Sequence, residues 1–415
     1  MFLNLNSSLC SSSVKLSKEG GFLLVVDNPL SWEYTWGIRV PVEAAGQCSV
    51  TGPDGKPVPS QMLRLSVGSE LVWAASKAAN EDSNKPTAEL ALLVTAPPIG
   101  HSVYTVTRRA GIAAGDAEQQ GEGQQLAAPT SVSTLASNSS VQLSSGKLQL
   151  TVGPAGISSV AVAGISVSYS STLIKYQGNF HGSGAYTFTA GGTPTAPAPS
   201  KVVVARGPLV QEVRQSFPDL PGTLTTRLWA GQSHLEVEWT VSPPPATNEW
   251  EVFVRYSSSI KSESLWFTDA NGREYQQRRR DYRPSFTLPA GATSTHRLPA
   301  NIYPITSGCY MKDAEAIMNV AVDRAQGAVS MSDGQLDINL HRKSADDDGK
   351  GMFQALFDHH VATGTHIVSF GPARDGAATK QGSTRRHYEQ VNAKVVDHLQ
   401  LLQPASAKDA CPGQH

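Results

Sequence analysis

Apolar and polar residues alternate in short runs along much of this chain. In residues 235–241, four apolar residues are separated by two glutamates and a threonine, and residues 146–152 and 336–341 show similar alternation. Because successive side chains of a strand point to opposite faces, this spacing predicts strands. We expect one face of each strand to be buried and the other, which carries Glu236 and Glu238 in the first run, to be solvated.

Turn signals separate these runs. Asn271-Gly272 lies between residues 265–268 and 273–276, and it predicts a two-residue type I′ hairpin because both residues tolerate a positive φ angle. Asp54-Gly55 and Pro97-Pro98 predict further turns. Many short strands with turns between them are typical of β-sandwiches, so we predict an all-β protein built from β-sandwich domains.

The composition divides the chain into segments. Residues 1–20 are rich in Ser and weakly patterned, which predicts a disordered tail. Residues 111–145 are dominated by Gly, Ala, Gln, Ser and Thr, so we predict a disordered linker. A small β-sandwich domain is expected over residues 21–110 and a large one over residues 146–405, with a tail over residues 406–415.

The end of the chain shows a different periodicity. Apolar residues recur there at intervals of three or four positions, which places them on one face of a helix. We therefore predict a short amphipathic C-terminal helix over about residues 384–400. The residues that form this apolar face are Tyr388, Val391, Val395, Leu399 and Leu402.

The chain has 415 residues and a formal net charge of -1. This length suffices for two or three β-rich domains with their own cores. The balanced charge gives no reason to expect nucleic acid or an anionic membrane as a partner. No apolar run approaches the roughly 20 residues that span a bilayer. The first ten residues lack the basic start and apolar segment of a signal peptide, so the chain taken literally would stay in the cytosol.

The cysteines and charge clusters offer little chemistry of their own. The four cysteines show no C-x-x-C spacing, so we expect no metal site, whereas one or two disulfides could form in an oxidising compartment. The cysteines are Cys10, Cys48, Cys309 and Cys411.

Asp346-Asp347-Asp348 is the one group of carboxylates that suggests catalysis, but adjacent acids point apart, and we interpret it as a solvated loop. We expect the arginines of residues 278–283 to form ion pairs with neighbouring strands rather than a nucleic-acid patch.

Three motifs carry a resemblance to a known family. They are Thr-Asp-x-Asn-Gly-Arg-Glu at residues 268–274, Arg-Arg-Asp-Tyr-Arg-Pro at residues 279–284 and Asp-Arg-x-Gln-Gly at residues 323–327. In this order and spacing they resemble the C-terminal, β-rich half of a class II (glycoside hydrolase family 38) α-mannosidase, with the lysosomal or vacuolar branch most similar. The resemblance is strong over residues 146–351 and weaker over residues 21–106.

The resemblance implies a galactose mutarotase-like supersandwich and a retaining glycosidase that removes α-linked mannose from N-glycans or free oligosaccharides. It places the nucleophile, the acid/base and the zinc ligands in an N-terminal barrel that precedes these residues, so no catalytic residue and no metal ligand is expected in this chain. The implied partners are that N-terminal catalytic half, in the same or a separate chain, and mannose-containing glycans. The implied location is a lysosome or vacuole, and this sequence is expected to be a fragment.

The resemblance also assigns residues to the sugar site. The segment Ser183-Gly184-Ala185-Tyr186 is similar to a family segment whose tyrosine reaches the cleft, which makes Tyr186 a candidate sugar contact. The loop with Asp348, Lys350 and Gly351 is similar to a family loop that closes the cleft, partly through its backbone. Lys350 stands where the family has Arg. Because Lys cannot reproduce a guanidinium fork, a backbone role survives this change more readily than a side-chain role.

A second hypothesis belongs to another class of protein. The chain could be a non-catalytic β-sandwich protein that binds carbohydrate or another protein. In that case exposed aromatic residues, such as Trp266 or Tyr282, would form the binding surface.

Overall fold

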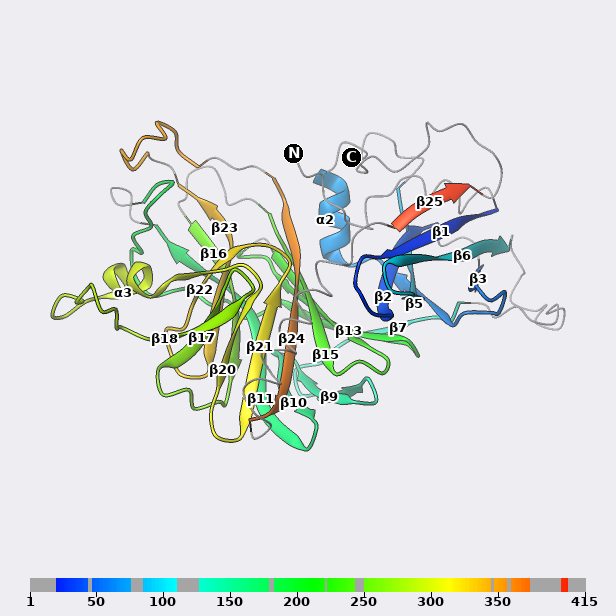
Figure 1. The fold of residues 1–415 in the computed structure, drawn as a ribbon, viewed down its shortest axis with the longest axis horizontal. Helices are drawn as coiled ribbons and strands as arrows, with labels where there is room; N and C mark the ends of the chain where they lie inside the picture. The colour runs from blue at the N-terminus through cyan, green and yellow to red at the C-terminus, as the bar shows by residue number, and fades with distance from the viewer. Residues whose placement is uncertain are drawn as a thin grey trace. The chain divides into compact units, whose positions relative to one another are not determined.

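The computed structural model divides the chain into two compact units (Figure 1). The first unit comprises Met1–Val132, Ala205–Gln211 and Asn392–His415, and the second comprises Ser133–Val204 and Glu212–Val391. The structure describes residues 20–43, 47–75, 85–109, 127–178, 183–220, 222–242, 250–344, 347–356, 360–373 and 397–401. Its elements are almost all strands, which confirms the predicted all-β class.

Two antiparallel sheets form the first unit. Alternate residues of β1 and β5, such as Phe22, Leu24, Leu90 and Leu92, are fully buried in its core. The one described helix of this unit is α2 (Val67–Ala75), which Ser66 caps through the N–H of Ser69. The sheets have the orders β25 (Asp397–Leu401), β1 (Gly21–Asn28), β6 (Gly100–Arg109), β3 (Gln47–Thr51), and β2 (Tyr34–Val42), β5 (Ala88–Ala96), β4 (Ser60–Arg64).

Two buried amides hold the first unit together. The Asn28 side chain donates to the carbonyls of Trp32, Ala96 and Pro97, and this fixes the turn that follows β1. The Gln61 side chain accepts from the N–H of Val210 and donates to its carbonyl, both at 3.0 Å. A buried amide with satisfied partners fixes the geometry of the chains around it, so Gln61 explains why Ala205–Gln211 groups with this unit.

Two larger sheets form the second unit. One has eight strands and the other ten. One cluster of buried residues contains side chains of both, such as Tyr256 and Ile338 from the eight-stranded sheet and Trp239 and Val320 from the ten-stranded sheet. The two sheets therefore pack face to face as a sandwich. The eight-stranded sheet has the order β19 (Tyr303–Ile305), β22 (Gln326–Val329), β23 (Gln335–Lys343), β16 (Trp250–Ser258), β11 (Ile165–Gln177), β10 (Gly156–Val162), β9 (Leu148–Gly153), β8 (Val141–Ser144). The ten-stranded sheet has the order β18 (Glu274–Arg279), β17 (Leu265–Ala270), β20 (Gly308–Lys312), β21 (Ala316–Val322), β24 (Ala362–Pro372), β15 (His234–Val241), β14 (Gly222–Trp229), β13 (Val210–Phe217), β12 (Lys201–Arg206), β7 (Ser131–Thr134).

The predicted C-terminal helix is wrong where the structure describes it. Residues 397–401 form β25, which pairs antiparallel with β1 in the register Phe22↔Leu401 to Val26↔Asp397. Leu399 and Leu401 also fit a period of two, so the apolar spacing alone did not decide between helix and strand. The open edge of β1 offers backbone partners, and these favour the strand. Residues 384–396 of the predicted helix lie outside the described residues.

The predicted linker is also wrong over its second part. Strands β7 (Ser131–Thr134) and β8 (Val141–Ser144) lie within the range 111–145. Most of their residues are Ser, Thr or Gln, with Val132, Val141 and Leu143 as the apolar ones, and the strands pair with their neighbours through the backbone, which composition does not reveal. Residues 111–126 lie outside the described residues.

The hairpin at Asn271-Gly272 is confirmed, but its loop has three residues rather than two. Ala270 pairs with Glu274, and both Asn271 (φ 52°) and Gly272 (φ 68°) have left-handed backbone conformations. The carboxylate of Asp269 accepts a hydrogen bond from the N–H of Gly272 at 2.9 Å. This bond ties the loop to the end of β17.

The polar face of β15 is buried, contrary to the prediction of a solvated face. Glu236 and Glu238 are only 6% and 7% exposed. Arg227 on the neighbouring β14 is fully buried and lies 3.4 Å from Glu236 and 3.2 Å from Glu238, while its Nε donates to Glu212 at 2.6 Å. Alternation along one strand cannot show that the adjacent strand supplies an opposite charge.

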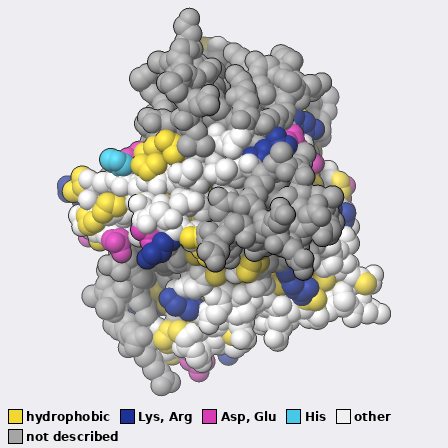
Figure 2. Space-filling model, turned by 90° about the vertical axis from the view of Figure 1, so that its right-hand side faces the viewer, with side chains coloured by type: hydrophobic (Ala, Val, Ile, Leu, Met, Phe, Trp, Pro, Cys, Tyr) yellow, Lys and Arg dark blue, Asp and Glu magenta, His cyan; other side chains and the backbone are white. Residues whose placement is uncertain are grey.

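Several large apolar side chains of the described residues are exposed at the surface. On the face drawn in Figure 2 they lie in several separate groups. Three of these side chains belong to two loops of the second unit, namely Tyr186 (64%), Met352 (45%) and Phe353 (84%). Neither described helix is long and apolar enough to cross a membrane.

Candidate functional site

The candidate site lies on the outer face of the eight-stranded sheet. In Figure 1 the segment before β12 and the loop after β23 extend from the same end of the second unit. A small apolar cluster on this face joins the segment that contains Phe188 and Ala190 to the sheet and to α3 (Ser294–Asn301). This cluster packs the segment onto a rigid support. Its residues are Ile174, Tyr176, Ala190, Phe253, Leu298 and Val329, with Phe188, Ile302 and Met331 against them.

Residues 183–190 form a tight loop with Tyr186 at its tip. The N–H of Gly184 donates to the carbonyl of Thr187 at 2.8 Å. The N–H of Thr189 donates to the Ser183 hydroxyl at 2.9 Å. One backbone bond and one bond to a side-chain hydroxyl thus close the loop on itself, so that the exposed Tyr186 projects from a defined turn.

Asp348 holds this loop from one side. One carboxylate oxygen accepts hydrogen bonds from the N–H of Tyr186 at 2.6 Å and from the N–H of Thr187 at 3.1 Å. The other oxygen accepts from the N–H of Lys350 at 3.2 Å. Desolvation raises the pKa of Asp348, but these backbone hydrogen bonds outweigh it and hold the pKa below its ordinary value. The carboxylate therefore joins the Tyr186 loop to the loop that carries Lys350 and Gly351.

Arg342 at the end of β23 holds the loop from the other side. Its guanidinium donates to the carbonyls of Gly184 and Ala185, both at 3.1 Å, and to that of Thr187 at 3.3 Å. Its Nε donates to the carboxylate of Glu251. A cation thus binds the carbonyl oxygens of the loop while an anion binds its amide groups, as the polarity of the peptide requires.

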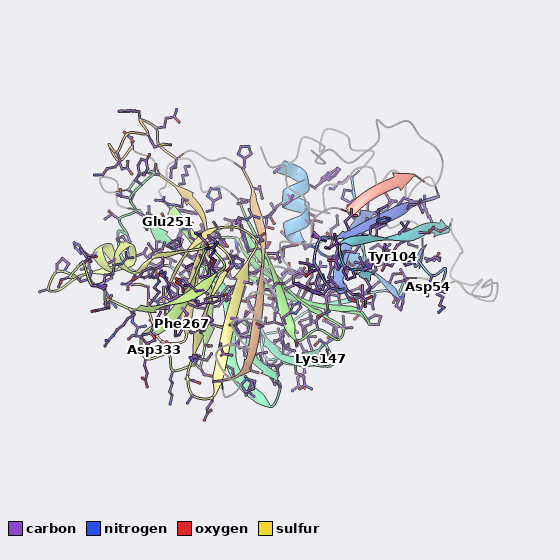
Figure 3. All side chains as sticks on the ribbon, viewed as in Figure 1. Asp54, Tyr104, Lys147, Glu251, Phe267 and Asp333 are labelled. Carbon is purple, nitrogen blue, oxygen red and sulfur yellow. The ribbon has the colours of Figure 1, made fainter. Side chains whose placement is uncertain are left out.

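Glu251, which is labelled in Figure 3, lies at the start of β16. It is directly opposite Arg342 in the antiparallel pairing of β16 with β23. It is 3% exposed, and Asn339 donates to its second oxygen at 3.0 Å. Burial raises the pKa of Glu251 to about 7, although the charge of Arg342 opposes this shift. Sequence reasoning missed both residues. The sequence signal that could have indicated Glu251 is its position as the one charged residue within the apolar run Trp250–Val254.

The structure brings the candidate sugar contacts together on two joined loops. Tyr186 is on one, and Asp348, Lys350 and Gly351 are on the other. Lys350 is exposed. Gly351 has a positive φ angle (107°), a conformation that glycine adopts with little strain because it has no Cβ. The Asp348 carboxylate is engaged by backbone amides, so its contribution is to shape the loops. Of the predicted acidic group, Asp346 lies outside the described residues.

The family-like motifs elsewhere build the framework. The guanidinium groups of Arg278 and Arg283 each lie 4.3 Å from the centre of the Tyr303 ring, and Arg280 pairs with Asp333 at 2.7 Å. The predicted ion pair is found at Arg280, whereas Arg278 and Arg283 contact an aromatic ring and donate to neutral oxygens.

The third motif surrounds a buried histidine. Gln326 lies 2.9 Å from Nε2 of His366, and the Tyr256 hydroxyl lies 2.8 Å from Nδ1. Desolvation lowers the pKa of His366 to about 4, which favours a neutral ring in this network. The motif residue Gln326 thus serves the interior of the sandwich.

Trp266 is 1% exposed, which overturns it as a binding residue of a carbohydrate-binding protein, whereas Tyr282 is 57% exposed. Among the described residues, no group of three or more His, Cys, Asp or Glu side chains could hold a metal ion. Cys48 and Cys309 are buried free thiols, and burial raises the pKa of both. Cys10 and Cys411 lie outside the described residues.

Comparison with known proteins places this chain in a family. Residues 143–350 match the model for the glycosyl hydrolases family 38 C-terminal domain. The lysosomal alpha-mannosidase of Homo sapiens is 28% identical over 391 residues, which cover 90% of this chain and 36% of that protein. The lysosomal alpha-mannosidase of Cavia porcellus is 30% identical over 383 residues, with 90% and 35% covered.

A solved structure shares the fold. It is a glycosyl hydrolase family 38 protein from Enterococcus faecalis, with a TM-score of 0.54 and 12% identity over 92% of this chain and 47% of that one. The matched model covers half of the chain and defines a C-terminal domain of the glycosyl hydrolase class. The chain belongs to glycoside hydrolase family 38 and carries the C-terminal domain of its alpha-mannosidases. It spans roughly a third of the length of the curated relatives named above.

The close approach of Gly184 to Asp348 makes a testable prediction. A Cβ at Gly184 would lie 2.4 Å from the Cβ of Asp348, so Gly184→Ala must push the two loops apart, at a cost of about 1 to 3 kcal/mol. We expect amide hydrogen exchange at Tyr186 and Thr187 to quicken by one to two orders of magnitude. Gly192→Ala is the matched control, because nothing lies within 4 Å of its added Cβ. Equal exchange in both variants would contradict the steric argument.

Stability should depend on pH through Glu251. Because burial raises its pKa to about 7, the folded chain keeps a proton that the unfolded chain has lost as the pH rises from about 4.5 to about 7. The free energy of unfolding should therefore fall across this window, by up to about 1.4 kcal/mol per pH unit. The Gln side chain of Glu251→Gln does not titrate in this window. Urea unfolding of the two proteins at several pH values therefore isolates the contribution of Glu251 to the pH dependence of stability. A difference that stays constant across the window would count against it.

Proposed function

We propose that this chain is the C-terminal, sugar-contacting part of a retaining α-mannosidase that hydrolyses α-linked mannose in N-glycans or oligosaccharides. The observation that carries the proposal is an exposed tyrosine, Tyr186, on a loop fixed by Asp348 and Arg342. A solvent-facing aromatic side chain on a rigid backbone is suited to bind a sugar. The family membership supports mannose as that sugar.

On this proposal each loop has a defined task. The Tyr186 hydroxyl hydrogen-bonds a mannose hydroxyl, and its ring covers an apolar face of the sugar. The loop of Lys350 and Gly351 closes beside the same sugar, with backbone groups as its main contacts. Lys350 adds a single positive charge rather than a two-pronged hydrogen bond.

The catalytic carboxylates and the zinc site belong, on this proposal, to an N-terminal half in the same or a separate chain. Zinc there would supply Lewis-acid chemistry at sugar oxygens. The share of the relatives that this chain covers, about a third, is consistent with such a partner. A lysosome or vacuole is the proposed location, and the names of the two relatives, both lysosomal alpha-mannosidases, support the lysosome.

The size of the native polypeptide tests this arrangement. An antibody raised against this chain should precipitate, from the cells that make it, a species or complex more than twice the size of the 44.1 kDa chain. The precipitate should hydrolyse an aryl α-mannoside. A species of about 44 kDa with no catalytic partner and no such activity would sink the proposal and favour a binding protein. In that case calorimetric titration of the chain with millimolar mannose would show saturable heat.

The role of Tyr186 is tested by removing its hydroxyl in the whole enzyme. Tyr186→Phe should lower kcat/KM for an α-mannoside by about 5-fold to 30-fold, as the loss of one hydrogen bond worth about 1 to 2 kcal/mol requires. Tyr282→Phe is the control, because Tyr282 is similarly exposed but lies in the loop after β18. Unchanged kcat/KM in Tyr186→Phe would remove this residue from the sugar site.

A further inference from the structure

The guanidinium of Arg342 donates hydrogen bonds to three carbonyl groups of the candidate sugar-binding loop. Gly184, Ala185 and Thr187 all direct their carbonyl oxygens at Arg342, at 3.1 to 3.3 Å. These three residues surround Tyr186 in the sequence. A shift of Arg342 would therefore move the backbone on both sides of the tyrosine.

The guanidinium is itself held in place. Glu251 accepts from its Nε, and the same carboxylate accepts from Asn339, so the donor group has one orientation. Glu251 and Arg342 face each other across β16 and β23 in the interior of the sheet order, where the strands have neighbours on both sides. Charge-assisted hydrogen bonds of this kind fix both distance and direction.

We infer that Arg342 is a positioning residue that presents Tyr186 to the sugar, with Glu251 fixing the orientation of its guanidinium. This inference rests on the proposed function of Tyr186. The planar guanidinium donates to several carbonyls and a carboxylate at once, whereas a Lys ammonium is a single point charge with a different geometry. Arg342→Lys therefore keeps the charge and loses the arrangement.

The same two strands provide a matched control. Arg255 on β16 and Asp337 on β23 form a second cross-strand pair, with hydrogen bonds of 2.8 and 2.7 Å. Within the described residues, Arg255 donates no hydrogen bond to the loop of residues 183–190. Arg255→Lys thus disturbs an ion pair of the same sheet without touching the carbonyls around Tyr186.

Hydrogen exchange of the 415-residue chain tests the positioning directly. Arg342→Lys should speed amide exchange at Tyr186 and Thr187 at least tenfold, while Arg255→Lys should leave it within twofold of the unaltered chain. Exchange that is unchanged in Arg342→Lys, or equally fast in both variants, overturns the inference. Thermal unfolding of both variants shows whether each still folds.

A double-mutant cycle in the whole enzyme tests the link to catalysis. Arg342→Lys alone should lower kcat/KM for an α-mannoside by about 5-fold to 30-fold. In a Tyr186→Ala background it should lower kcat/KM by less than twofold further, because its effect runs through that side chain. Independent, multiplicative losses would overturn the inference. If Tyr186→Ala by itself leaves kcat/KM unchanged, the proposed function of Tyr186 fails, and the exchange measurement alone decides whether Arg342 holds the loop.

Discussion

The candidate site depends on a short loop whose backbone is held between two opposite charges. The carboxylate of Asp348 accepts from the amide groups of Tyr186 and Thr187, and the guanidinium of Arg342 donates to the carbonyls around them. Peptide groups are dipoles, so an anion at their N–H ends and a cation at their C=O ends satisfy both. The absence of a side chain at Gly184 lets Asp348 approach closely enough to do this. A solvent-exposed tyrosine thereby gains a fixed backbone.

The sheets of the second unit support this loop through paired charges. Two ion pairs join β16 to β23, namely Glu251 with Arg342 and Arg255 with Asp337. Arg227 forms ion pairs with glutamates of both β13 and β15. Each pair uses the cross-strand register to place opposite charges side by side, and hydrogen bonds offset part of the cost of burying them. Such pairs specify which residues face each other, which apolar packing alone defines less sharply. The outer face of the eight-stranded sheet can then carry a loop in one defined position.

The sequence predicted the regular elements better than the contacts between them. The alternation in residues 336–341 and the turn at Asn271-Gly272 correspond to β23 and to the β17–β18 hairpin. The same alternation led to a solvated face for Glu236 that is in fact buried, because the opposing charge of Arg227 lies on another strand. Around the candidate site, Tyr186 and Asp348 were found through family motifs. Arg342 and Glu251 were missed because their roles depend on register.

By itself the sequence determined the all-β class, the positions of several strands and the family, since these follow from local periodicity, turn chemistry and motifs in a fixed order. Only the tertiary structure decided that residues 397–401 extend a sheet, because β1 supplied the backbone partners. It also decided which charges are buried and which carbonyls meet Arg342. The bonds from Arg342 to these carbonyls join residues more than 150 positions apart, and no local pattern encodes such a distance.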